Sequence, residues 1–525
     1  MQNIKLLDCT LRDGGYINNW AFGKKVIHKV VSKVARAGID VIECGYLSTR
    51  NSGDEDTARF NSIEDVRRAY VANKSTYQKY AVMVNFGEYP IEMFSNADSD
   101  DPIIRVAFHK KDLDDVLIYC ENLKRKGYCC IIQPMGALNY TDEEFVQMIK
   151  KINILEPEAF YIVDSFGVME LKDFQRLLFL TDNNLNQKID LGYHSHNNLQ
   201  QAYSNSKYMV EQNLSHGLII DASVFGMGRG AGNLNIELFA KYLNQNFHKN
   251  YNIEPILEVF DECLKPIFAK CFWGYSLPFY LSSIHNCHPN YASYFAEKNT
   301  LSVRSMHELL SMITEDDKTS FSPEKASNYY TRYQENYVDD HEALEVIKNA
   351  IGKKEVLVLA PGQSLKNREN VIKQFVEEKS PVIFGINHMR ETFCYEFLFV
   401  VNEKRLPSGK PDNVKNLIVT SNLKCNLAEN ICVNYASYLN SDNRISDDPT
   451  LMLINLLTAI GIKKITIAGF DGFSANPDDN YFEQGLSLGS NIITKIHKNE
   501  VIRENISKLR EQIELVFLTP SRYLD

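Results

Sequence analysis

Short apolar runs rich in β-branched residues alternate with helix-compatible segments along the first half of the chain. Eight runs follow one another up to about residue 228: IKLLDC, DVIECGY, YAVMVNF, IIRVAFH, CCIIQPMG, AFYIVDSFG, IDLGYHSH and GLIIDASVFGMG. Nearly continuous apolar strands that alternate with helices are typical of a parallel sheet covered by helices. Eight such units predict an α/β fold of the (β/α)8 TIM-barrel kind, with an open doubly wound sheet as the alternative.

Polar residues collect where these runs end. The active sites of such barrels lie at the carboxyl ends of the strands, so residues far apart in the sequence are expected to converge on one mouth. The residues at these positions are Arg12, Asp13, Glu43, Asn85, Gln133, Asp164, His194, His196, Asp221 and Ser223.

The pattern changes after about residue 250. Segments such as IEPILEVFDECLKPIFAKC have helical periodicity, and strand-like runs then return as EVLVLA, PVIFGIN, EFLFVVN, NLIVTS, KITIAGF and ELVFLT. We therefore predict a barrel over 1–245, a helical extension and linker over 246–345, and a second, smaller Rossmann-like α/β domain over 346–525. A length of 525 residues agrees with more than one domain.

Composition narrows the class of protein. The net charge of −10 argues against a broad nucleic-acid or acidic-membrane surface. No apolar run approaches the roughly 20 residues that span a bilayer, and the first residues lack the pattern of a signal peptide. The eleven cysteines are scattered without a CxxC pair, which is typical of reduced thiols. We expect a cytoplasmic protein with no nucleic-acid partner and no membrane span.

The sequence GYHSHNN places two histidines two residues apart on a predicted strand. His194 and His196 therefore share one face of that strand. Two imidazoles and a carboxylate form a facial ligand set that leaves positions open for a substrate. The alternative is a pair of hydrogen-bonded histidines at a strand end. Alternation along the first strand leaves Asp8 and Asp13 both open as the carboxylate.

Three motifs together resemble one family. DCTLRDGG, HSHNN and GMGRGAGN, in this order, resemble the metal-dependent aldolase and Claisen-condensing barrels, relatives of hydroxymethylglutaryl-CoA lyase, isopropylmalate synthase and 4-hydroxy-2-oxovalerate aldolase. The resemblance covers about residues 4–290. It implies that Asp13, His194 and His196 bind a divalent ion, and that Asn233 can approach the metal.

The resemblance also implies catalytic roles. Arg12 would stabilise the enolate left by carbon–carbon cleavage, whereas the alternative is a structural salt bridge with Glu43. Tyr16 stands where the aldolase branch commonly carries a histidine, and LRDGGY also departs from the LRDGEQ of the condensing branch. Tyr16 is thus a candidate acid or base. Tyr275, beyond the barrel, is a second candidate, with aromatic packing as the alternative.

The second domain opens with EVLVLAPGQSL, which reads as a strand, a glycine-containing turn and a helix. A helix N-terminus after a tight turn can bind an anion. With FGINHM and KKITIAGFDGFS, the segment resembles bacterial surface-polysaccharide proteins with sialyltransferase-like or pterin-diphosphokinase-like domains. That resemblance implies a nucleotide or nucleotide-sugar site formed by Gly362, Gln363, Ser364, Asn387 and Asp471. The alternative is an inactive scaffold.

These observations predict a divalent-metal-dependent carbon–carbon lyase, an aldolase acting through a metal-bound enolate of pyruvate or a related 2-oxo acid, with an aldehyde as the second substrate. Manganese is the first choice of metal, with magnesium, cobalt or zinc as alternatives. The fused domain suggests a bifunctional protein of surface-polysaccharide sugar biosynthesis. We also expect a homo-oligomer. The alternatives are an acyl-CoA-dependent Claisen condensation and a nucleotide-binding or glycosyltransferase-like protein with a silent barrel.

Overall fold

The computed structural model of the chain describes residues 3–50, 54–70, 78–425, 430–442, 444–483, 486 and 492–524. The chain divides into two compact units, Met1–Ala292 and Ser293–Asp525, and each is described by itself. The stretch predicted as helical extension and linker, 246–345, is divided between these units.

Unit 1 is a closed parallel barrel, as predicted. The first strand pairs with both the last and the second strand, with Ile4 opposite Leu218 and Leu7 opposite Val41, and this closes the sheet. A two-residue strand, β3 (Arg59–Phe60), adds to the outer edge. Each barrel strand coincides with one predicted run: β1 (Ile4–Asp8), β2 (Val41–Leu47), β4 (Lys79–Asn85), β5 (Ile103–Phe108), β6 (Cys130–Pro134), β7 (Ala159–Asp164), β8 (Asp190–Ser195) and β9 (Leu218–Ala222).

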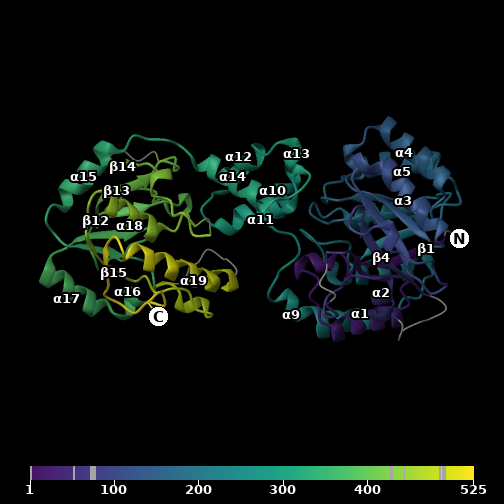
Figure 1. Ribbon diagram of the computed structural model, residues 1–525, viewed down its shortest axis with the longest axis horizontal. Coiled ribbons are helices and arrows are strands. Elements are labelled where there is room, and N and C mark those ends of the chain that lie inside the picture. The colour runs from purple at the N-terminus through teal and green to yellow at the C-terminus, as the bar shows by residue number, and fades with distance from the viewer. Residues whose placement is uncertain are drawn as a thin grey trace. The chain divides into compact units, whose positions relative to one another are not determined.

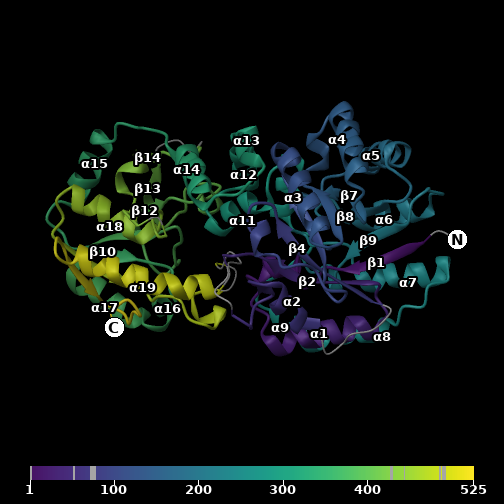
Figure 2. The same ribbon diagram turned by 45° about the vertical axis from the view of Figure 1, so that its right-hand side comes forward.

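Helices follow the strands and surround the barrel (Figures 1 and 2). In α4, Thr141 and Glu144 form a reciprocal capping box, and the buried Phe145, Met148 and Ile152 recur at helical spacing toward the strands. The helices of unit 1 are α1 (Lys24–Arg36), α2 (Ile63–Tyr70), α3 (Leu113–Arg125), α4 (Asp142–Leu155), α5 (Leu171–Asn184), α6 (Ala202–Glu211), α7 (Ile236–Phe247), α8 (Ile253–Val259), α9 (Lys265–Phe268) and α10 (Leu277–Ile284), of which α10 does not lie against the barrel (Figure 1). The helix α11 (Pro289–Lys298) crosses the division between the units.

The barrel interior contains a buried charge in an otherwise apolar layer. Arg105 of β5 is fully buried and forms ion pairs with Glu43 of β2, at 2.8 Å, and with Asp221 of β9. Its guanidinium also lies 4.8 Å from the ring centroid of Tyr161. The apolar neighbours in the interior include Leu7, Cys9, Val41, Ala81, Ile103, Ile131, Ala159, Val163 and Ile219. The single arginine of IIRVAFH is therefore neutralised by carboxylates from two other strands.

Unit 2 is a second α/β domain built on a parallel sheet. Its strand order is β14-β13-β12-β11-β10-β15-β16, so chain order reverses between β10 and β15. Six strands lie at the predicted runs; the four-residue β14 lies at the sheet edge, is half-buried over most of its length, and was not predicted. The strands are β10 (Val356–Leu359), β11 (Val382–Ile386), β12 (Tyr395–Val400), β13 (Val414–Thr420), β14 (Asn430–Val433), β15 (Lys464–Ala468) and β16 (Glu514–Phe517).

Helices cover both faces of this sheet. Apolar side chains of α15, α18 and α19 pack on one face, and those of α16 and α17 pack on the other. A helical segment of α12, α13 and α14 precedes the first strand. Their bounds are α12 (Val303–Ser311), α13 (Glu315–Lys318), α14 (Pro323–Gln334), α15 (His341–Ile351), α16 (Ser364–Asn367), α17 (Glu369–Lys379), α18 (Pro449–Ala459) and α19 (Ile492–Leu509).

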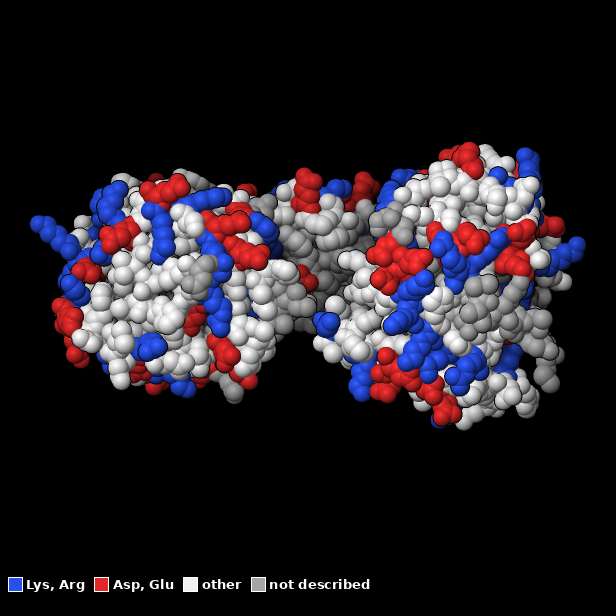
Figure 3. Space-filling view, turned by 60° about the horizontal axis from the view of Figure 1, so that its bottom comes forward, with Lys and Arg blue, Asp and Glu red and all other residues white. Residues whose placement is uncertain are grey.

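The charge of the chain is spread over the surface. On the face shown in Figure 3, basic and acidic side chains lie side by side on the described parts of both units. None of the described helices is long and apolar enough to cross a membrane.

Replacing Arg105 with methionine should destabilise the protein. The substitution removes the buried counter-charge of both Glu43 and Asp221, and breaking a buried ion pair from one side typically costs about 3–5 kcal/mol. Urea unfolding followed by far-UV circular dichroism measures this loss. The matched control is Arg125→Met, which removes an exposed pair with Glu121 on α3 and should change stability by less than about 1 kcal/mol. An equal effect of the two substitutions would contradict the network.

Asp8 should make stability depend on pH. This carboxyl group is fully buried at the end of β1, accepts a hydrogen bond from the Thr10 hydroxyl, and has no partner for Oδ2 among the described residues. Burial, together with repulsion by Glu43 and Asp221, raises the pKa of Asp8 to about 7.

The folded state therefore keeps this proton while the unfolded chain loses it, so stability falls from about pH 4 to about pH 7. Asp8→Asn cannot titrate. Its unfolding free energy relative to the parent protein should rise over this window and level off above it, as chemical denaturation at pH 5 and pH 8 would show. A difference that does not change with pH would rule out the buried acid.

Candidate active site

Three residues that are distant in the sequence form a compact buried cluster at the barrel mouth. Asp13 follows β1, and His194 and His196 lie at the end of β8. One ligand atom from each residue lies within 4.8 Å of the others. All three side chains are at most 5% exposed. The cluster has the composition of a two-histidine, one-carboxylate metal site.

The turn after β1 directs Asp13 toward the histidines. The Asp13 amide donates to the Cys9 carbonyl at 2.8 Å, and the Trp20 indole donates to the Arg12 carbonyl at 2.7 Å. A Cβ atom on Gly15 would lie 2.0 Å from the Trp20 ring, so this close approach requires glycine. The strand has therefore ended before Asp13. Strand alternation alone could not distinguish Asp13 from Asp8, whose carboxyl group is bound by Thr10 instead.

A second carboxylate orients the first histidine. Nδ1 of His194 lies 3.0 Å from Oδ2 of Asp221, which leaves Nε2 for a metal ion. Burial acts to raise the pKa of Asp221, but the charge of Arg105 and the hydrogen bond with His194 hold it below its usual range. Asp221 is therefore ionised and fixes the orientation of the imidazole. In the sequence Asp221 is recognisable as a polar residue at a strand end, but no local pattern marks it as a partner of His194.

His196 also directs a ring nitrogen into the cluster with Asp13 and His194. Its Nδ1 is buried without a hydrogen-bond partner among the described residues and lies 3.7 Å from Oδ2 of Asp13. Burial, which outweighs the attraction of Asp13, lowers the pKa of His196 to about 3. The imidazole is therefore neutral near pH 7, which is the form that binds metals.

Asp13 is held ionised by its neighbours. Burial acts to raise its pKa, but the interactions with the His196 ring, the charged Arg12 guanidinium and the His194 ring hold it well below the usual range. Nη1 of Arg12 donates to Oδ1 at 2.6 Å and Nδ2 of Asn233 donates to Oδ2 at 2.8 Å.

Asn233 is paired with His196 through an isolated β-bridge, and its own Oδ1 is buried without a described partner. One carboxylate, two imidazoles and an unpartnered amide oxygen fit a divalent cation.

Arg12 lies between two carboxylates. Its Nε donates to Glu43 at 2.8 Å while Nη1 binds Asp13. Nη2 of Arg12 is buried and has no partner among the described residues. The salt bridge considered from the sequence is thus present, and one N–H group of the guanidinium remains available beside the cluster.

Tyr16 and the glycine-rich loop form the rim of the site. The Tyr16 hydroxyl lies 3.1 Å from the Tyr46 hydroxyl, and the Arg229 guanidinium lies 5.4 Å from the Tyr16 ring centroid. The Arg229 backbone N–H donates to Oδ2 of Asp13, and its Nη2 donates to the Ser165 carbonyl. The glycine-rich loop is recognisable in the sequence, whereas the role of Arg229 is not, and its position between two glycines is the one signal that could have indicated it.

Tyr275 lies apart from this cluster. Its side chain is 57% exposed, and its ring centroid lies 6.5 Å from that of Tyr280. None of its contacts within the described part of the chain reaches Asp13, His194 or His196.

In unit 2, three of the five predicted residues line one cavity of about 240 Å³: Gly362, Asn387 and Asp471. Ser364 instead supports the turn, because its N–H and hydroxyl both donate to Asp471 and the hydroxyl also contacts Thr519. Gln363 precedes the four-residue α16 and makes no side-chain cap there.

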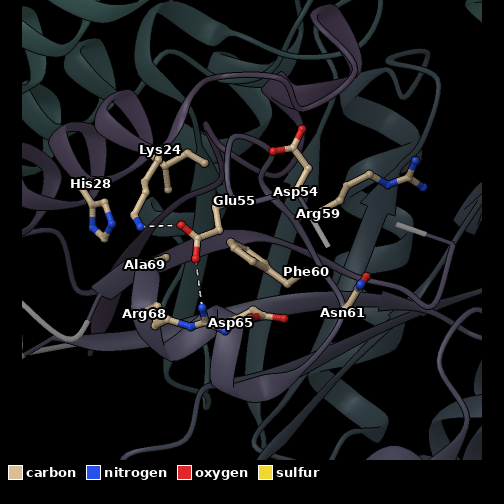
Figure 4. Close-up of a pocket in the computed structure, with 11 residues that line it drawn as sticks. Lys24, His28, Asp54, Glu55, Arg59, Phe60, Asn61, Asp65, Arg68 and Ala69 are labelled. Carbon is tan, nitrogen blue, oxygen red and sulfur yellow. Dashed lines mark hydrogen bonds and ion pairs between the residues drawn. The ribbon is translucent and has the colours of Figure 1, made fainter. Parts of the chain in front are cut away.

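A further hollow of about 50 Å³ lies outside the barrel, between α1 and α2 (Figure 4). Glu55 forms ion pairs with both Lys24 and Arg68 across the hollow, so the charges of these three residues offset one another. We assign no function to this hollow.

The first half of the chain matches a known family model. The HMGL-like model matches residues 3–262. A 4-hydroxy-2-oxovalerate aldolase of Geobacillus genomosp. 3 is 27% identical over 246 residues, which are 46% of this chain and 71% of that protein. An oxaloacetate decarboxylase of Mycobacterium tuberculosis is 24% identical over 243 residues, 46% of this chain and 70% of that protein.

A solved structure, the HMG-CoA lyase of Brucella melitensis, is 15% identical with a TM-score of 0.42; the match covers 51% of this chain and all of that one. The matched stretch 3–262 includes all eight barrel strands and the cluster of Asp13, His194, His196 and Asn233. This part of the chain is therefore similar to the HMGL-like family over the whole barrel.

Proposed function

We propose that unit 1 is a divalent-metal-dependent aldolase that makes or breaks a carbon–carbon bond next to the ketone of pyruvate or a related 2-oxo acid. The observation that carries the proposal is the buried cluster of Asp13, His194 and His196 beside the Arg12 guanidinium. The names of the relatives, an aldolase and a decarboxylase of 2-oxo acids, support the same class of reaction.

A divalent cation held by Asp13, His194 and His196, with Asn233 beside them, would act as a Lewis acid on the substrate ketone. Arg12 adds a fixed positive charge through its unpartnered Nη2 where the enolate charge develops. Glu43 holds that guanidinium in position, so it need not reorganise during the reaction. Asp221 does the same for the His194 ring.

Proton transfer is assigned to the rim of the site. Tyr16 is partly exposed at the mouth and shares a hydrogen bond with Tyr46, so its hydroxyl can hold a proton that a second tyrosine hydroxyl orients. Manganese is the first metal to test, and an aldehyde is the second substrate. A place in surface-polysaccharide synthesis rests only on the resemblance of the second domain.

The enolate half-reaction can be measured without knowing the aldehyde. In deuterated buffer with manganese, the protein should exchange the methyl protons of pyruvate, as NMR after quenching with EDTA would show. Asp13→Ala and His194→Ala should each slow exchange by at least about 100-fold, because each removes a ligand of the Lewis acid. Both variants should also lose bound metal, as measured by plasma mass spectrometry.

The control is Asp142→Ala, which removes an exposed carboxylate of α4 that pairs with Arg176. It should leave both exchange and metal content unchanged. Absence of exchange with manganese, magnesium, cobalt and zinc would overturn the pyruvate assignment. Exchange that survives both ligand substitutions would overturn the metal site.

Arg229 suggests the class of the aldehyde. Arg12 and Arg105 are each paired with carboxylates, whereas Arg229 forms no ion pair within 4 Å in the described part of the chain. Among the described residues, its side chain contacts the Ser165 carbonyl, the His288 ring and the Tyr16 face. This positive charge at the rim would favour an aldehyde that carries a carboxylate or phosphate.

Arg229→Gln should therefore lower kcat/KM for glyceraldehyde 3-phosphate by roughly 10- to 100-fold, the value of a charged hydrogen bond. The value for neutral glyceraldehyde and the rate of pyruvate exchange should change little. Steady-state kinetics with both aldehydes test this preference. An equal loss with the two aldehydes, or a loss of pyruvate exchange, would show that Arg229 acts on the donor or on the fold.

A further inference from the structure

Unit 2 has a cavity of about 240 Å³ at the carboxyl ends of its central strands. Gly362 follows β10, Asn387 follows β11 and Asp471 follows β15, and all three residues line it. Strand order reverses between β10 and β15. In open parallel sheets, ligands bind in the crevice at such a reversal.

Four carboxylates line this cavity, and three of them are hydrogen-bonded by the protein itself. Asp447 accepts the Tyr330 hydroxyl. The fourth, Glu297, lies within electrostatic range of Lys298 and Lys498. Asp448 caps α18 by accepting the backbone N–H groups of Thr450 and Leu451, at 3.0 and 3.1 Å. Asp471 accepts the N–H of Ser364 at 2.6 Å and also its hydroxyl. The amide at the start of the four-residue α16, where the sequence suggested an anion, is therefore already bound to a carboxylate.

The cations of the cavity outnumber the close contacts that they make with carboxylates, because Glu297 and Asp448 act on Lys298 or Lys498 only at longer range. Lys298, Arg405 and Lys498 line it, and none forms an ion pair within 4 Å in the described ranges of the chain. Lys298 lies over tyrosine rings, and Arg405 donates to the backbone carbonyl of Leu486. Burial lowers the pKa of Arg405, which indicates that its charge lacks compensation.

One wall of the cavity is aromatic. Phe473 and Tyr481 line it, and each is only partly buried. The ammonium of Lys495 lies 5.7 Å from the centroid of Phe473 and 5.6 Å from that of Tyr481. Such rings can stack on any planar nucleobase, and nearby cations strengthen the stacking.

We propose that this cavity of unit 2 binds a nucleotide, with its phosphates on Lys298, Arg405 and Lys498 and its base against Tyr481 and Phe473. Three cations with no carboxylate within 4 Å among the described residues select an anion, and the aromatic wall selects a planar ring. The inference stands on unit 2 alone and does not depend on the reaction proposed for unit 1.

Isothermal titration calorimetry on the full-length protein tests the site, with ADP, GDP, CDP, UDP and inorganic pyrophosphate as probes. At least one nucleoside diphosphate should bind at one site per chain and more tightly than pyrophosphate. Lys498→Gln and Arg405→Gln should each weaken that binding by about tenfold or more, since each removes a charged hydrogen bond. Tyr481→Ala should weaken nucleotide binding but not pyrophosphate binding.

The matched control is Lys463→Gln. Lys463 is exposed and directly precedes β15, at the amino ends of the strands and away from the cavity. It should leave all affinities unchanged, and thermal melts should show that every variant is folded. No nucleotide binding at about 1 mM would overturn the proposal. Binding that Lys498→Gln and Arg405→Gln leave intact, or pyrophosphate binding as tight as that of every nucleotide, would also overturn it.

Discussion

An alternating chain of buried charges organises the barrel of unit 1. Asp221, Arg105, Glu43, Arg12 and Asp13 are linked in that order by ion pairs, and each member is at most 4% exposed. A buried charge without a partner is costly, so each member fixes the next. Both ends of the chain act on the candidate ligands, because Asp221 orients His194 and the other end is Asp13 itself. The same ion-pair network therefore stabilises the barrel and positions the candidate metal ligands.

Most of the fold could be predicted from local patterns of apolar and polar residues in the sequence. Apolar runs marked all eight barrel strands, and the polar residues after them marked the mouth, since both signals depend on neighbours in the sequence. The choice between Asp8 and Asp13 could not be made that way, because it depends on the packing of Trp20 against Gly15. The roles of Arg105 and Asp221 depend on strands that are distant in the sequence, although a single arginine in an apolar strand was a visible signal.

In unit 2, too, local sequence patterns predicted the elements but not the contacts between distant segments. The strand, turn and helix around Gly362 were readable, and Gly362 does line the cavity. The Ser364 N–H donates to the Asp471 carboxylate, which lies on a separate loop. No local sequence pattern could predict this contact. Lys298, Arg405 and Lys498 come from three separate segments. A cationic wall assembled in this way can be found only once the chain is folded.

The closure of the barrel by its first and last strands has a consequence for synthesis on the ribosome. Residues 4–8 of β1 pair with residues 218–222 of β9, and His194 depends on Asp221 of that last strand. Contacts of such sequence separation form late, because the intervening chain must first be ordered. A nascent chain that has not yet reached residue 222 lacks both the closing strand and the partner of His194. A cation that bound Asp13, His194 and His196 in this geometry would therefore do so only after translation of the whole barrel, whatever its abundance in the cell.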